Sequence, residues 1–315
     1  MDITQLRTLV HVAELGSLSR AAERLNTVQP ALSRQIRLLE EELQVRLFAR
    51  HGRGMSVTPI GQEIVAAAAR IMGEAETIRT IAADDGLTFR GQIRIGLTPT
   101  MSEFMIPELT KRIRADHPKL EIQFKTAFSS YLVDWLQKGE LDLVAGYNPP
   151  PSPALRVEPV VIEDLFLVGR PGYGLDMNTP VRFADLSGES FVLPARGHAL
   201  REIVDDCARL AGVRIEASIM ADSMRAMLDL VKVGFGVTFL PLAPIYEEML
   251  KGRLEVAPLL DPKPHRRVVM CFPTDRPVQP ATRYAGVLFR TISAELVASN
   301  KWGGKMLEPD QPQGI

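Results

Sequence analysis

The sequence has few cysteines, no membrane-length apolar run and no recognisable leader. Cys207 and Cys271 are isolated, without a CxxC pair or histidines at metal-ligand spacing, which favours reduced thiols and no metal site. A redox-sensing pair is the less favoured alternative. No apolar stretch approaches a membrane span, and Met1-Asp2 begins without the basic and apolar segments of a signal peptide. We therefore expect a cytoplasmic protein that does not enter a membrane.

Signatures of catalysis are also missing. The five histidines are scattered without an HExxH pattern, and no G-x-S-x-G elbow occurs. The run Gly234-Phe235-Gly236 lies between an expected helix and an expected strand, which is the wrong order for a dinucleotide loop. We expect a non-enzyme without a cofactor. An enzyme on an α/β scaffold is the alternative, and turnover assays on candidate acids would distinguish the two.

Lysine is absent before Lys111, so every cation of the first third is arginine or histidine. Arginine suits forked contacts with phosphates and base edges. Residues 1–58 hold eight arginines against six acidic residues, and the whole chain has a net charge of −1. Affinity for DNA would therefore depend on where the arginines lie rather than on net charge.

The stretch from Leu18 to Leu43 predicts two short helices joined at Asn26-Thr27-Val28. Apolar residues recur at helical spacing on one side of the second helix, and Pro30 suits its first turn. Its other side offers Gln29, Ser33, Arg34 and Arg37, which match the hydrogen-bonding groups of the major groove. With a first helix over Ile3–Leu15, this pattern indicates a helix-turn-helix, although a helical hairpin inside a larger core has the same periodicity.

A hairpin and a long helix follow. Residues 47–50 and 55–58 are expected to form a wing that contacts phosphates. The candidate DNA-binding residues are Ser17, Ser19, Gln29, Pro30, Ser33, Arg34, Arg37, Arg50 and Arg53. From Pro59 to about Asp85 a near-heptad stripe predicts a linker helix that dimerises through Ile64, Ile71 and Ile78, against the alternative of a solvated spacer.

From Gly91 onward, strands alternate with helices. The order βαβαβ over 92–146, a long strand at 157–168, a second βα series and a returning strand at 267–272 predict a parallel sheet. Two α/β lobes joined by two crossing strands form the architecture of periplasmic binding proteins. Thus we expect an all-α winged helix-turn-helix at 1–58, a linker and hinge at 59–90, and a two-lobed α/β domain at 91–297. Lobe I would cover 91–160 and 268–297, lobe II 161–267, and a disordered tail 298–315.

Several runs resemble LysR-type transcriptional regulators. They are LSRAAERLN, QPALSRQIRLLEEEL, VTPIG, PELTKRIRADHPKLEIQF, LQKGELDLVAGY and LVKVGFGVTFLP, and the resemblance covers about 1–296. EDLFLVG and FVLP look closest to members similar to the nitrogen assimilation control regulator. Val28 departs from the family, which usually has a capping serine there. Thr27 is the alternative cap, and without either the helix start is weaker than usual.

The resemblance implies a regulator controlled by a small molecule held between the lobes. Candidate positions follow strands and precede helices, where free N–H groups favour an anion. They are Thr98, Thr100, Ser129, Arg196, His198 and Ser223. Helix capping explains Ser129 and Ser223 equally well, whereas Thr98, Thr100 and Arg196 match the family's effector pocket. The expected partners are double-stranded DNA with a near-palindromic operator, a carboxylate or other anion, a homodimer or homotetramer, and RNA polymerase.

Overall fold

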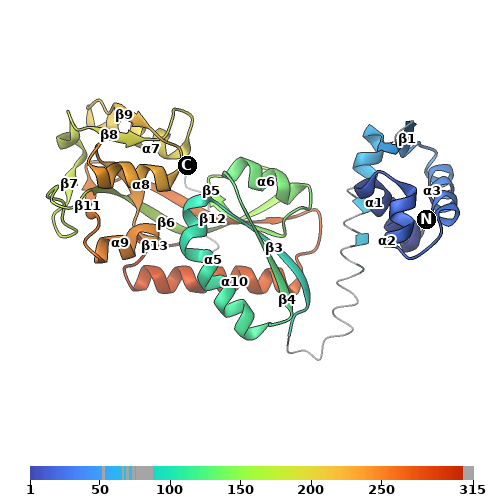
Figure 1. The fold of residues 1–315 in the computed structure, drawn as a ribbon. Coiled ribbons are helices and arrows are strands. Elements are labelled where there is room, and N and C mark those ends of the chain that lie inside the picture. The colour runs from blue at the N-terminus through green and yellow to red at the C-terminus, as the bar shows by residue number, and fades with distance from the viewer. Residues whose placement is uncertain (52–53, 66, 69–70, 73–74, 76–87, 308–315) are drawn as a thin grey trace. The chain divides into compact units, whose positions relative to one another are not determined.

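The structure is a computed structural model that describes residues 1–51, 54–65, 67–68, 71–72, 75 and 88–307. It divides into two compact units, Met1–Gly91 and Gln92–Ile315 (Figure 1). In the first unit, helices precede a hairpin: α1 (Ile3–Leu15), α2 (Leu18–Arg24), α3 (Gln29–Leu43), β1 (Phe48–His51) and β2 (Gly54–Val57). The predicted helix-turn-helix and wing strands are therefore present.

Local signals explain where these helices begin and end. The Asp2 side chain accepts the Gln5 N–H at 2.8 Å, and Gly16 ends α1 with φ 59°. Ser17 caps α2 by accepting the Arg20 N–H at 3.4 Å. Val28 occupies the cap position of α3, which has no side-chain cap, so Thr27 does not replace the missing serine. Buried leucines, valine and isoleucine from all three helices form one small core.

Glu40 anchors the hairpin to α3. Its Oε1 accepts the N–H groups of Leu47 at 2.8 Å and Phe48 at 3.3 Å, and its Oε2 pairs with Arg46. On the other strand, the Met55 N–H donates to the Gly16 carbonyl at 3.1 Å. The hairpin is thus held at a fixed place beside the second and third helices.

Helical residues follow the hairpin from Pro59, at 59–65, 67–68, 71–72 and 75. The predicted dimerising stripe divides here. Ala68 is buried in the core of the first unit and Ile64 packs against that core, whereas Ile71 is 43% exposed. Ile78 lies outside the described residues. Of the three predicted contacts, Ile71 is therefore the one that the described part of this helix presents to solvent.

The second unit is a mixed α/β domain. Its elements begin with β3 (Gly91–Leu97), α5 (Pro99–Asp116), β4 (Leu120–Thr126), α6 (Ser129–Gln137), β5 (Leu143–Tyr147) and β6 (Leu155–Gly169). They continue with β7 (Val181–Arg182), η1 (Phe183–Leu186), β8 (Phe191–Leu193), α7 (Ala199–Ala211), β9 (Ala217–Met220), α8 (Met224–Val233) and β10 (Thr238–Pro241). The last are η2 (Ala243–Ile245), α9 (Tyr246–Leu250), β11 (Glu255–Leu260), β12 (His265–Pro273), α10 (Pro280–Ala298) and β13 (Gly304–Met306).

Strand β6 joins the two lobes. A sheet with the order β4-β3-β5-β12-β6-β11-β7 runs through the unit, and β10 and β13 also pair with β6. The first part of β6 pairs with β12, and its last residues pair with β10 and β11. Lobe I is built on β3–β5 with α5, α6 and α10, and lobe II on β7–β11 with α7, α8 and α9 (Figure 1). The predicted two-lobed α/β fold is correct, and β6 is the strand that pairs in both lobes.

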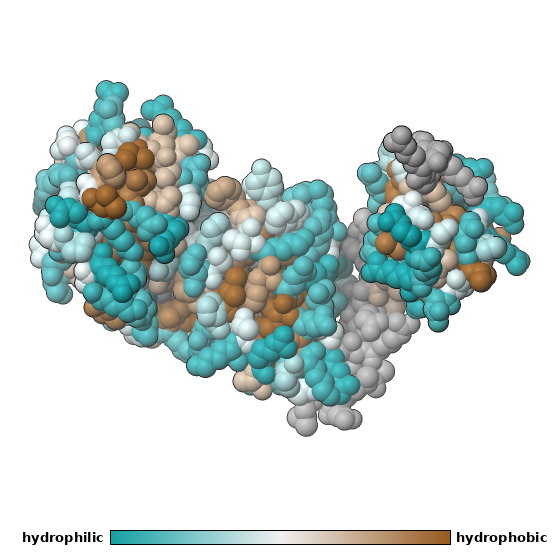
Figure 2. All heavy atoms as spheres, in the orientation of Figure 1, coloured by the Kyte–Doolittle hydropathy of each residue, from teal (hydrophilic) through white to brown (hydrophobic). Residues whose placement is uncertain are grey.

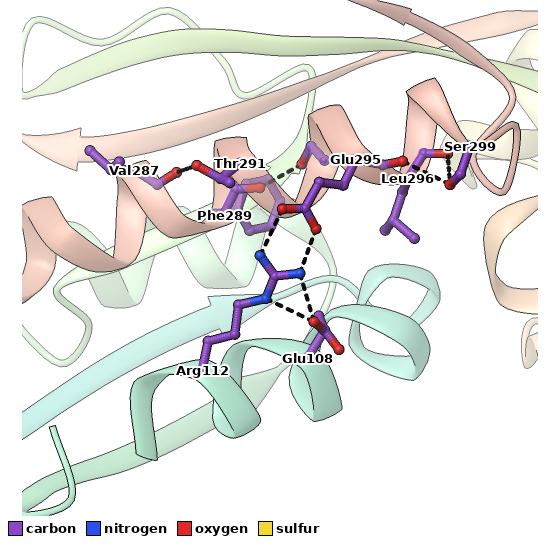
Figure 3. Close-up of polar contacts among 9 residues, drawn as sticks. Glu108, Arg112, Val287, Phe289, Thr291, Glu295, Leu296 and Ser299 are labelled. Atoms are coloured by element: carbon purple, nitrogen blue, oxygen red, sulfur yellow. Dashed lines mark hydrogen bonds and ion pairs between the residues drawn. The ribbon is translucent and has the colours of Figure 1, made fainter. Parts of the chain in front are cut away.

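Helices α5 and α10 lie side by side and are tied by ion pairs. Arg112 of α5 donates to both oxygens of Glu295 on α10, with 3.0 Å from Nη1 to Oε1, and also pairs with Glu108 one turn back (Figure 3). Because a planar guanidinium makes two parallel bonds with a carboxylate, the contact fixes orientation as well as distance. The closing helix is thereby joined to the first helix of lobe I.

Two expectations for this unit were wrong. Helix α5 begins at Pro99 rather than at Ile106, because proline is well placed in a first turn and Pro107 is accommodated inside the helix. The predicted disordered tail is partly ordered: β13 pairs with β6, and Trp302 is 1% exposed. The glycines of this segment suggested disorder. In the structure, Gly303 lies against the Phe166 ring and Gly304 against the Ile162 carbonyl, and glycine fits at both positions because a Cβ would clash. Residues 308–315 lie outside the described part.

Among the described residues, no helix is long and apolar enough to cross a membrane. The face seen in Figure 2 is mostly hydrophilic, with hydrophobic side chains in separate patches. The second unit has buried apolar clusters, around Phe191, Phe239 and Val231 in lobe II and around Leu132, Leu136 and Val144 in lobe I.

Candidate functional site

The exposed side of α3 carries the predicted base-reading residues. Gln29, Pro30, Arg34 and Arg37 are exposed, and Ser33 is half-buried. Arg37 makes a solvent-exposed ion pair with Glu41 at 3.4 Å, whereas Arg34 has no hydrogen-bond or ion-pair partner among the described residues. The opposite side of the helix holds the buried Leu32, Ile36 and Leu39, so packing fixes which side faces outward.

The structure describes the rest of the predicted DNA-binding set only in part. Ser17 is occupied as the cap of α2, and Ser19 is exposed in the first turn of that helix. The backbone of Arg50 lies in β1 opposite Met55, but Arg53 lies outside the described residues. The groove between α3 and the hairpin is lined by Ser33, Arg37, Arg46 and Thr58, among others. Polar and cationic side chains therefore flank the recognition helix on its hairpin side.

In the second unit, several predicted effector residues lie at the starts of helices. Thr98, Phe128 and Ser223 occupy the cap positions of α5, α6 and α8, and none of the three helices has a side-chain cap. Their first N–H groups therefore remain available to an anion. Thr100 is in the first turn of α5, and the half-buried Ser129 begins α6.

A buried polar cluster connects the start of α6 with strands β5, β6 and β12. The Ser129 hydroxyl accepts the Tyr147 N–H at 3.0 Å, which connects the start of α6 to the end of β5. Arg266 Nη2 donates to the Tyr147 hydroxyl at 2.7 Å, and its Nε donates to Glu163. The Thr98 hydroxyl lies beside the Tyr147 phenol but makes no well-aligned hydrogen bond, although it is buried.

Burial dominates the electrostatics of this cluster. It raises the pKa of Tyr147, so the phenol is neutral at physiological pH. Arg266 is 6% exposed and keeps its charge because Glu163 lies against it. Its Nη1 group has no hydrogen-bond partner among the described residues and is not fully enclosed. The cluster thus presents a cationic donor beside an unpaired hydroxyl.

Lobe II approaches the cluster through His198. Its ring makes an edge-on contact with Phe128 of lobe I at 5.3 Å between centroids, and its Nδ1 accepts the Leu200 N–H at 3.1 Å. Burial lowers the pKa of His198; nearby Asp222 opposes this shift, and Arg266 adds to it. The predicted His198 therefore does lie close to the first-lobe residues. Ser223 is exposed at the start of α8.

Arg196 does not fit the prediction that it faces Thr98 and Thr100. It is exposed and makes no polar contact with either threonine within the described part of the chain. It lines a different groove of lobe II, with Arg201, Asp205, Arg209, Arg214 and Met220. The cation of the cluster is Arg266, which the sequence did not reveal because it lies in the polar start of β12, between His265 and Arg267 and away from any helix start.

The two thiols are poorly suited to redox chemistry. Cys207 is buried in α7, where burial raises its pKa to about 11, and burial raises the pKa of Cys271 in β12 to about 12. They belong to separate hydrophobic clusters. Because the thiolate is the reactive form, raised pKa values disfavour reaction of these cysteines at neutral pH. The described residues hold no group of three or more His, Cys, Asp or Glu side chains that could bind a metal ion.

Comparison with known families decides the identity of both units. Residues 3–62 match the bacterial regulatory helix-turn-helix family of LysR, and residues 88–285 match the LysR substrate binding domain. The chain belongs to the LysR family of transcriptional regulators. It is a DNA-binding transcriptional regulator with an effector-binding domain, and its relatives are regulators rather than enzymes.

Characterised relatives agree with the family. The transcriptional regulator BbuR of Bordetella bronchiseptica is 32% identical, over 83% of this chain and 80% of its own length. The dual regulator OxyR of Escherichia coli is 29% identical, over 89% and 92% of the two chains. These matches do not test the closer resemblance to the nitrogen assimilation control regulator, which stays a prediction.

Solved structures share the fold of this LysR-type regulator. A full-length OxyR variant from Pseudomonas aeruginosa has a TM-score of 0.72 and 26% identity, covering 99% of each chain. Full-length CbnR complexed with its target DNA has a TM-score of 0.56 and 21% identity, covering 93% of this chain and 100% of that one. At this identity, the likeness to CbnR shows a shared fold.

Proposed function

We propose that this regulator senses a small organic anion bound between its lobes by Thr98, Ser129, Tyr147, His198 and Arg266. The observation that carries the proposal is the buried, poorly bonded Thr98 hydroxyl beside the Arg266 cation. A buried hydroxyl without a partner is costly, which supports a ligand atom as its missing partner. Thr100 and Ser223 would contribute from the same helix starts.

The electrostatics of the site favour negative charge. Helices α5, α6 and α8 begin without side-chain caps, so their free N–H groups and dipoles stabilise an anion nearby. The Nη1 group of Arg266 adds a charge-assisted donor. A ligand that touches Thr98 in lobe I and His198 in lobe II would favour one arrangement of the lobes, and hence one geometry of the dimer on DNA.

Hydrogen peroxide is a second candidate signal, because relatives are named hydrogen peroxide-inducible genes activators. The thiols of this chain do not support it. Cys207 and Cys271 are buried in separate clusters, and their raised pKa values leave little thiolate to react with a peroxide. We therefore favour reversible binding of an anion over oxidation.

On DNA, we propose that Arg34, Gln29 and Ser33 read bases while Ser19, Arg50 and Arg53 hold phosphates. A dimer paired through the linker helix would place two recognition helices roughly 10 base pairs apart, which favours a near-palindromic operator. Bound at promoters in the cytoplasm, it would act on RNA polymerase directly or by occluding it.

Thermal unfolding with a panel of mono-, di- and tricarboxylates tests the anion site. A binding carboxylate at about 100 times its dissociation constant should add roughly 2.7 kcal/mol to the stability of the full-length protein. Arg266→Met should abolish this gain. Arg196→Met is the matched control, because Arg196 lines a separate groove, and should keep it. If Arg196→Met removes the gain and Arg266→Met does not, the site is in the wrong place.

A further inference from the structure

The C-terminal segment, residues 301–307, contacts the same polar cluster through Trp302. Trp302 Nε1 donates to Glu163 Oε1 at 2.7 Å, while the other carboxylate oxygen of Glu163 accepts from Arg266. All three side chains are buried, at 1%, 0% and 6% exposed for Trp302, Glu163 and Arg266. Glu163 and Arg266 lie directly opposite each other on the two crossing strands. Trp302 therefore touches the ion pair that holds the candidate effector cation.

The segment is firmly docked at this place. Gly304 and Met306 pair with Glu163 and Val161 of β6, and the Leu307 N–H donates to the Val160 carbonyl at 2.8 Å. Arg290 of α10 bonds the carbonyls of Leu307 and Pro159, at 2.9 and 2.7 Å. Pairing with β6 and the Arg290 bond to the Leu307 carbonyl fix the register of this segment, and with it the position of the indole.

The same segment touches both lobes. The Trp302 ring makes an edge contact with Phe104 of α5 at 4.9 Å between centroids, and Lys301 lies over the Tyr246 ring of lobe II at 5.8 Å. Thr98 is the cap residue of α5, so the indole packs against the helix whose start belongs to the proposed effector site. Trp302 thus contacts the site through two routes, one polar and one apolar.

We propose that Trp302 is a positioning residue for effector binding, which acts through Glu163 on the orientation of Arg266. A carboxylate that accepts only from Arg266 can rotate with it, whereas the indole N–H fixes the second oxygen. The Arg266 fork is then held with Nη2 on Tyr147, which would leave Nη1 to donate to the effector. The proposal rests on the anion site described above and adds to it the C-terminal segment.

Inorganic sulfate is the probe, because it presents anionic oxygens to the same donors. Its dissociation constant would be measured by calorimetry on the full-length protein. Trp302→Phe keeps an aromatic ring and removes the N–H, and we expect it to weaken sulfate binding about fivefold. Trp135→Phe is the matched control, since Trp135 lies on α6 over Lys125, away from Glu163, and should leave the affinity unchanged.

A double-mutant cycle separates positioning from general destabilisation. In an Arg266→Lys background, which keeps the charge and loses the fork, Trp302→Phe should have little further effect on affinity. Gly304→Ala gives an independent variant, because its Cβ would lie 2.0 Å from the Ile162 carbonyl oxygen. It would displace β13 while Trp302 keeps its indole N–H. It should weaken sulfate binding in the same way as Trp302→Phe.

The outcomes distinguish the two proposals. If Arg266→Lys weakens sulfate binding and Trp302→Phe does not, or if their effects simply add, the positioning role is wrong and the anion site stands. If wild type shows no sulfate binding up to about 100 millimolar, a level at which even a 1 mM site would be saturated, or Arg266→Lys binds as tightly, the anion site is wrong and Trp302 has no role in it.

Discussion

Arg34 has no polar partner among the described residues. It lies on the exposed side of α3, opposite the buried Leu32, Ile36 and Leu39. Its sequence context already predicted that position, because helical spacing of Leu32, Ile36 and Leu39 leaves one side for DNA. What spacing does not decide is whether this arginine reads a base or a phosphate, since both contacts use the same fork.

Replacing Arg34 with alanine should reduce affinity for the specific operator by roughly 1–3 kcal/mol and relax sequence preference. Titrations on operator and on random DNA would measure both quantities. Arg24→Ala is the control, because Arg24 is paired with Glu14 at 3.0 Å outside α3. Equal losses on the two DNAs would mean that Arg34 contacts only phosphate, and Arg53→Ala should give that result with a shallower salt dependence.

His198 should make the stability of the effector domain depend on pH. Burial lowers its pKa in the folded protein, so the unfolded chain binds its proton more readily. Its contribution to stability is complete above about pH 6.5, the ordinary histidine value, and is lost as the pH falls through and below that value. His198→Asn keeps a good cap for α7. Between pH 7.5 and 5.5, its urea midpoint of unfolding should fall less than that of wild type. Parallel pH profiles would contradict this account.

The proposed effector site shows what one sequence can reveal about single residues. Thr98, Ser129 and His198 were predicted candidates, because strand ends and helix starts can be read from periodicity. Arg266 and Tyr147 were not, since Arg266 lies in the polar start of β12 and Tyr147 at the end of an apolar strand, and their meeting depends on the pairing of β12 with β5 and β6. Arg196 was misplaced because a turn before a helix does not determine which way its side chain points.

Among the secondary-structure elements, the hairpin of β1 and β2 depends for its stability on the Glu40 carboxylate more than on its own sequence. A two-stranded hairpin is marginally stable in water unless it packs against other structure. Glu40 supplies that attachment through two N–H groups and is largely buried, at 10% side-chain exposure. The adjacent Glu41 is 61% exposed and makes only a surface ion pair with Arg37.

Glu40→Ala should therefore destabilise the DNA-binding unit by about 1–3 kcal/mol, because two backbone donors lose their acceptor. Chemical unfolding followed by circular dichroism measures the change, and operator affinity should fall with it. Glu41→Ala should alter the free energy of unfolding by less than about 1 kcal/mol. Similar effects from the two variants would mean that the hairpin is held by its apolar contacts alone.

Most helices and strands of the effector domain followed from alternating patterns, and apart from the start of α5 their ends agree within a few residues. Strands β11 and β13 were missed for different reasons. Residues 255–260 contain Pro258, and proline is disfavoured in a strand because it has no N–H to donate, yet Pro258 lies in β11 opposite Phe166. Residues 304–306 are too short to show a period, and their order comes from β6 and from the burial of Trp302.

For the whole molecule, the linker helix carries the prediction of dimerisation. Ile64 and Ala68 pack within the first unit, which leaves Ile71 as the exposed apolar residue of the described stripe. Ile71→Asp, alone and with Ile78→Asp, should yield monomers in sedimentation experiments. Val287→Asp on α10, where Val287 is 68% exposed, tests the alternative that the effector domains hold the pair. If Val287→Asp alone yields monomers, the effector domains hold the dimer together and the linker helix is only a spacer.

We propose that an anion bound between the lobes changes how this regulator occupies its operator. DNase I footprinting on the DNA upstream of its own gene, with and without the carboxylate that most stabilises the protein, tests this directly. We expect the carboxylate to change the extent or pattern of protection by wild type and by Arg196→Met. Arg266→Met should give the ligand-free footprint in both conditions. A normal response from Arg266→Met would contradict the account.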